Sequence, residues 1–177
     1  MSNSANKSDS TQLPRVDLIV CGEQEIVQDY PHLNVIREVG APATVFNKHM
    51  GENLCLCLGP HERLAVDSVI STMVNKITSD IRGVYSDHIQ IGDYIYQQIF
   101  PSWSIALLGG AIIINSPLLL LPAEIIRFKE GFELLYHYDF MMRYGSENLL
   151  THIPQYLFHI DITTIDLRKE IEHVKSS

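Results

Sequence analysis

The chain has 177 residues, the length of one ordinary domain. Hydrophobic residues make up 46% of it and charged residues 19%, so it can bury a core, and this composition excludes a wholly disordered protein. Thirteen basic against twenty-one acidic side chains give a net charge of −8, which argues against a nucleic-acid partner because such proteins carry a basic face. We expect a flexible N-terminal tail at residues 1–12 and a single α+β domain at 13–177.

The three cysteines show no disulfide framework. Cys55 and Cys57 alternate within a Leu-Cys-Leu-Cys-Leu run, so on a strand they share one face, where disulfide geometry is seldom met. Together with Cys21 they predict reduced thiols in the core of a cytoplasmic protein. Residues 1–12 also lack the apolar run of a secretory signal.

The first half of the chain predicts strands followed by one long helix. Short β-branched or apolar runs indicate strands at Val16–Cys21 and Leu54–Leu58, with weaker strand signals at residues 33–36 and 44–46. Between Pro60 and Gly83, apolar residues recur at steps of three and four. This spacing predicts an amphipathic helix over 61–82 whose opposite face is ordinary polar surface.

An uncharged run at residues 103–122 is long enough to span a bilayer. Turn signals at Gly109-Gly110 and Asn115-Ser116-Pro117 interrupt it, and no basic cluster lies beside it. We therefore favour a buried strand at Ala111–Ile114 and keep a membrane anchor through 103–122 as an alternative. Residues 85–100 indicate a partly helical segment, 149–162 a short aromatic segment interrupted by Pro154, and 164–174 a polar terminal helix.

A long helix is predicted over 122–144, with Pro122 in its first turn and Gly145 after its end. Glu130, Glu133 and His137 line one stripe of this helix at i, i+3 and i+7. We interpret the stripe as a solvated face, because bundle metal centres need a Glu-x-x-His pair and matching ligands on a second helix. The alternative is a metal-dependent hydrolase in which these three residues are weak catalytic or metal-ligand candidates.

The segment before this stripe resembles the approach to the active-site helix of zincin metallopeptidases. The resemblance rests on a glycine-led apolar run at 109–116, a leucine run at 118–121 and a segment at 123–128 that holds the acidic residue Glu124, and it covers about 30 residues. The family's His-Glu-x-x-His positions then fall on 129–133, where only the glutamate, Glu130, matches. Lys129 and Glu133 replace both histidines, so the resemblance implies a zincin-like scaffold without its metal.

No phosphate-binding glycine loop and no nucleophile elbow occur, so we expect no cofactor and no metal. The predicted α+β fold is a small sheet of Val16–Cys21, Leu54–Leu58 and Ala111–Ile114 with two main helices packed on it. We expect a non-catalytic interaction or regulatory protein that binds a protein partner or forms a homo-oligomer, with no nucleic acid. The interface candidates are aromatic and methionine side chains of types enriched in interface cores, which could equally fill the domain's own core: Tyr138, Met141, Met142, Tyr156 and Phe158.

Overall fold

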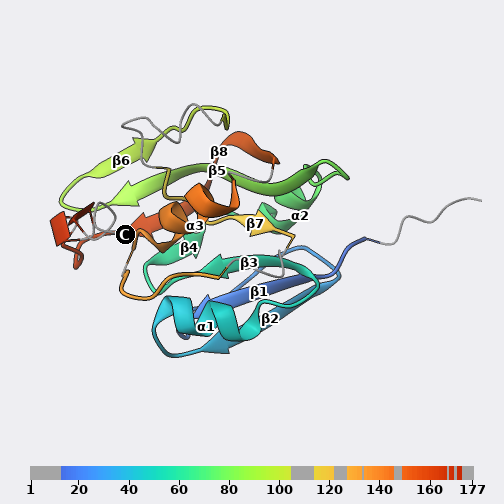
Figure 1. The fold of residues 1–177 in the computed structure, drawn as a ribbon, viewed down its shortest axis with the longest axis horizontal. Coiled ribbons are helices and arrows are strands. Elements are labelled where there is room, and N and C mark those ends of the chain that lie inside the picture. Colours follow the sequence, from blue (N-terminus) through green and yellow to red (C-terminus); the bar gives the residue numbers. More distant parts are fainter. Residues whose placement is uncertain are drawn as a thin grey trace, which may run out of the picture.

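The computed structural model describes residues 13–104, 114–121, 127–132, 134–145, 149–166, 168–169 and 171–172. Within them, eight strands form one mixed sheet that curls into a half-barrel (Figure 1). The strand order is β2-β1-β3-β7-β5-β8-β4, and β6 pairs with β5 off this path. The strands are β1 (Val16–Cys21), β2 (Leu33–Glu38), β3 (Leu54–Leu58), β4 (Glu62–Leu64), β5 (Ile81–Ile91), β6 (Ile95–Gln98), β7 (Leu119–Leu120) and β8 (Leu149–Asp161).

Two apolar cores lie on the two faces of the sheet. Helices α1 (Pro42–His49) and α3 (Tyr136–Tyr144) pack on one face, which also holds all three thiols, and α2 (Val69–Val74) packs on the other. Every residue of β1 and of β3 is buried because both faces of these strands are covered. Their bounds are those predicted from the sequence, and the weaker strand signal at 33–36 is confirmed as the start of β2.

The predicted fold class, a small sheet carrying two main helices, is wrong, since the sheet dominates the described residues. The predicted helix over 61–82 is divided among three elements. Glu62–Leu64 forms β4 against β8, only Val69–Val74 is helical, and β5 begins at Ile81. At both ends of the segment 61–82, strand pairing outweighs the helical spacing of the apolar residues. In the middle, the apolar residues of α2 form a helix and face the core.

The predicted helix over 122–144 is confirmed only at its end, where α3 covers Tyr136–Tyr144. Gly131 has φ of +96°, a left-handed conformation that no α-helix continues through. Phe128 and Phe132 are still buried, 3% and 5% exposed, but from an irregular segment. Residues 122–126 and Glu133 lie outside the described part of the chain.

Other predictions fail for local reasons. Residues 44–46 belong to α1, which Pro42 opens at its first turn. The segment 85–100 is the β5–β6 hairpin and has no helix. Of the strand predicted at 111–114, Ile114 is buried in irregular structure and the rest lies outside the described residues.

Segment 149–162 forms the longest strand of the sheet, β8, in spite of Pro154. Ser86 pairs with Ile153 and Asp87 with Tyr156, so a bulge leaves Pro154 out of the ladder. Proline has no N–H to donate, and a bulge is where a sheet interior can hold it. Residues 168, 169, 171 and 172, within the predicted terminal helix, are helical. Among the described residues, no helix is long and apolar enough to cross a membrane.

Candidate functional site

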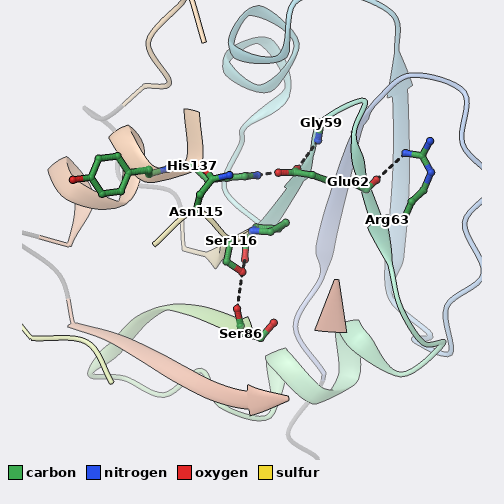
Figure 2. Close-up of polar contacts among 9 residues, drawn as sticks. Gly59, Glu62, Arg63, Ser86, Asn115, Ser116 and His137 are labelled. Atoms are coloured by element: carbon green, nitrogen blue, oxygen red, sulfur yellow. Dashed lines mark hydrogen bonds and ion pairs between the residues drawn. The ribbon is translucent and has the colours of Figure 1, made fainter. Parts of the chain in front are cut away.

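A carboxylate and an imidazole meet inside the molecule, between β4 and α3 (Figure 2). Oε2 of Glu62 lies 3.0 Å from Nε2 of His137, and the backbone N–H of Gly59 donates to the same oxygen over 2.7 Å. The side chains of Glu62 and His137 are 0% and 1% exposed. The short Gly59–Glu62 turn aims the carboxylate inward, and the first turn of α3 brings the ring to it.

Further polar groups surround this Glu62–His137 pair. Burial first, and then the negative charge of Glu62, raise the pKa of Tyr136 well above its usual value. Burial also lowers the pKa of His88 to about 4, against the opposing charges of Glu62 and Asp87. Nδ1 of His88 and Nδ1 of His137 are buried without a hydrogen-bond partner in the described structure. The cluster therefore concentrates proton-binding groups in a place that solvent does not reach.

A second histidine–carboxylate pair anchors the β5–β6 hairpin. Oδ1 of Asp87 lies 2.7 Å from Nε2 of His152 on β8, and it accepts the backbone N–H of Phe100 over 2.8 Å. The His152 ring stacks on Tyr85 with ring centroids 5.1 Å apart. Because Phe100 follows β6, the pair fixes the chain where the hairpin returns to the core.

The sequence-predicted stripe is not brought together as a site. His137 is buried against Glu62, whereas Glu130 is exposed and accepts a hydrogen bond from Thr44 of α1 over 3.1 Å. Glu133 lies outside the described residues. Within the described ranges, no three His, Cys, Asp or Glu side chains are placed to hold one metal ion.

Sequence reasoning missed Glu62 as the partner of His137, because 75 positions separate the two residues. The available signal was a glutamate two residues after the Gly59-Pro60 turn. It becomes informative only when the pairing of β4 with β8 places that side chain inside.

The interface candidates divide between the core and the surface. Met141 and Phe158 are 1% and 0% exposed and belong to the chain's own two cores. Tyr138, Met142 and Tyr156 are partly buried, and Tyr138 packs against the core beside α3.

Among the residues that the structure describes, the largest group of exposed apolar side chains lies instead on and beside β6, at the opposite end of the molecule from β1 and β2 (Figure 1). Tyr94, Ile95, Tyr96 and Ile99 are 71%, 73%, 50% and 68% exposed. Among the described strands, β6 pairs with β5 alone, so no other described strand lies along its outer edge. We call these four residues the β6 patch.

No family model matches the chain, and no curated protein is similar to it. Residues 127–132, where the zincin resemblance places the start of the active-site helix, are irregular or in a turn. The resemblance stays a prediction.

The buried thiols should be unreactive in the folded protein. Burial raises the pKa of Cys55 to about 11 and also raises the pKa values of Cys21 and Cys57. Because the thiolate is the nucleophile, iodoacetamide at pH 8 should alkylate these thiols at least about 100-fold more slowly in the native chain than in urea. Mass spectrometry of timed samples measures this. Rapid labelling of Cys55 in the native state would contradict its burial.

His88 should make the fold sensitive to mild acid. The pKa of His88 in the folded chain, about 4, lies below the usual 6.5. Below pH 6.5 the unfolded chain therefore binds more protons than the folded chain does, and the unfolding free energy decreases as the pH falls. Between pH 7 and pH 5 this histidine should remove about 2 kcal/mol of unfolding free energy. His88→Leu should lose correspondingly less over that interval in urea titrations. Equal losses in both proteins would show that other groups cause the acid sensitivity.

Proposed function

We propose that the chain is a non-catalytic protein-binding module and that its binding surface is the β6 patch. The observation that carries the proposal is the exposure of four large apolar side chains on and beside β6, whose outer edge pairs with no other described strand. Soluble monomers normally protect such an edge with charge, proline or a covering element. Neither lysine nor arginine occurs in the sequence from Gly83 to Ile126, so the hairpin itself carries no such cation.

The mode of binding that fits is strand addition. A partner segment that lies along β6 would satisfy the outward backbone groups of that strand, and its side chains would cover the β6 patch. The alternation of side chains across β6 exposes both faces, so a partner can contact either.

The burial of the Glu62–His137 pair supports a structural role for these two titratable side chains. Glu62 and His137 are the groups best suited to proton transfer, but at 0% and 1% exposure a substrate cannot reach them. The three free and buried cysteines are consistent with a reducing compartment, and we propose the cytoplasm.

Photo-crosslinking tests the proposal. A benzophenone amino acid replaces Tyr96 in the patch or, as the control, Val39, which is 75% exposed beyond the end of β2. After irradiation in extract of the source cells, we expect protein adducts from position 96 and none of comparable yield from position 39. Equal yields at both positions would overturn the proposal.

A further inference from the structure

The occupant of the β6 edge follows from the pattern of β6 itself. We propose that it is β6 of a second copy of this chain, paired antiparallel about a twofold axis at Gln97. The inference rests on the proposed function, because it names the partner of that same surface. The resulting contact is isologous, with the same residues contributed by both subunits.

The alternation of side chains and backbone groups along a strand determines where the twofold axis can pass. In an antiparallel pair, opposite residues share a face and direct their backbone groups either both toward or both away from each other. A strand that pairs with its own copy must therefore match positions separated by an even number, so the axis passes through a residue and not between two. With the axis at Gln97, Ile95 lies opposite Ile99 of the partner subunit, and Tyr96 lies opposite Gln98 of the partner subunit.

This register places the most exposed isoleucines of the patch side by side. Ile95 and Ile99 are 73% and 68% exposed in the single chain, and β-branched side chains directly opposite each other stabilise antiparallel pairs. The same face continues onto β5, where Ile91 pairs with Ile95 and Ile89 pairs with Gln97. Both β5 isoleucines are partly exposed, so the pairing joins two apolar strips into one.

The charge distribution permits the contact. No charged residue occurs from Tyr94 to Trp103, so the paired segments bring no like charges together. Asp93, at the hairpin tip, would lie opposite Pro101 of the partner subunit. The two Asp93 carboxylates would then be eight positions apart along the ribbon, roughly 27 Å, which exceeds the Debye length at physiological salt. The net charge of −8 on each copy opposes association over a longer range, and salt screens this repulsion.

Analytical ultracentrifugation of the full chain from 1 to 500 μM, roughly the range of weak strand-mediated dimers, tests self-association. We expect a monomer–dimer equilibrium that strengthens between 50 mM and 500 mM NaCl, about a threefold change in Debye length. Ile95→Lys and Ile99→Lys should each raise the dissociation constant about tenfold or more, since lysine on an edge strand opposes pairing. The matched control Val39→Lys, at an equally exposed valine, should leave it unchanged.

A disulfide test examines the register. Directly opposite Cα atoms in an antiparallel pair are about 4.5–5.5 Å apart, within the range that a disulfide spans. Gln97→Cys should therefore give a covalent dimer when oxidised glutathione accepts the two electrons and two protons of the thiol pair. Gln90→Cys, on β5 of the same hairpin, should give none, because β6 separates that position from the axis.

Three results would overturn the inference: a monomer at every concentration, a dimer that Ile95→Lys and Ile99→Lys leave intact, or a dimer that salt weakens. Each remains distinguishable from failure of the proposed function. A monomeric chain that still crosslinks another protein from position 96 loses the second copy as partner but keeps the patch as a binding surface. A chain that crosslinks nothing preferentially there loses both.

Discussion

Gly59→Ala should destabilise the chain by about 3 kcal/mol, near the upper end of the usual cost of inserting a methyl group into a packed interior. A Cβ at this position would overlap the hydroxyl of Tyr136 and lie 2.7 Å from its Cζ atom. Tyr136 is fully buried at the start of α3, so its ring cannot move aside without displacing the helix. Urea unfolding at pH 7.5 measures the free energy.

Gly51→Ala is the matched control, because a Cβ there meets nothing within 4 Å. It should change stability by less than about 0.5 kcal/mol, as surface substitutions do. Adding Tyr136→Phe to Gly59→Ala removes the overlapping hydroxyl and should restore part of the loss, so the two changes should not be additive. Equal costs for the two glycine variants would show that α3 does not pack tightly on this turn.

Removing either member of the buried Glu62–His137 pair should cost about 3 kcal/mol, the upper end of the usual penalty for leaving a buried polar group without its partner. Glu62→Leu leaves the His137 ring in the interior without its carboxylate. His137→Leu leaves the buried carboxylate without the imidazole, although the Gly59 N–H still donates to it. Both free energies come from urea unfolding at pH 7.5.

The double variant Glu62→Leu, His137→Leu separates the cost of an orphaned charge from the value of the pair. It should lose less stability than either single variant, because two apolar side chains leave neither a carboxylate nor an imidazole without its partner. The Gly59 N–H loses its acceptor in the double variant as it does in Glu62→Leu. Glu130→Ala serves as the control at an exposed glutamate and should stay within about 0.5 kcal/mol of the parent. Strictly additive single and double losses would contradict coupling between the two side chains.

The sequence predicts the central strands because their burial is visible locally. β1 and β3 are short apolar runs closed by Gly22 and by Gly59-Pro60, and such runs indicate strands covered on both faces. The helices predicted over 61–82 and 122–144 are confirmed only at α2 and at α3, because apolar residues at helical spacing belong there to several elements. Two features decide the outcome: the left-handed conformation of Gly131 and the pairing of β4 with β8. The spacing of apolar residues along the sequence reveals neither of them.

The candidate site was predictable only in part. His137 was singled out for its position on a helix stripe, and it does lie in α3. Its interaction is with Glu62 on a distant strand, and spacing within one helix carries no information about such a partner. The β6 patch was missed because residues 85–100 were interpreted as partly helical, and a hairpin exposes a different set of side chains than a helix does.

The position of β4 has a consequence for synthesis on the ribosome. Among the described strands, β4 joins the sheet through β8 alone, at Phe158–Ile160, and Phe158 leaves the exit tunnel some 94 residues after Leu64. Until His137 emerges, 75 residues after Glu62, the carboxylate lacks its imidazole partner, and its strand neighbour Ile160 emerges later still. A nascent chain must therefore carry this carboxylate in water, and its burial is one of the last events of folding.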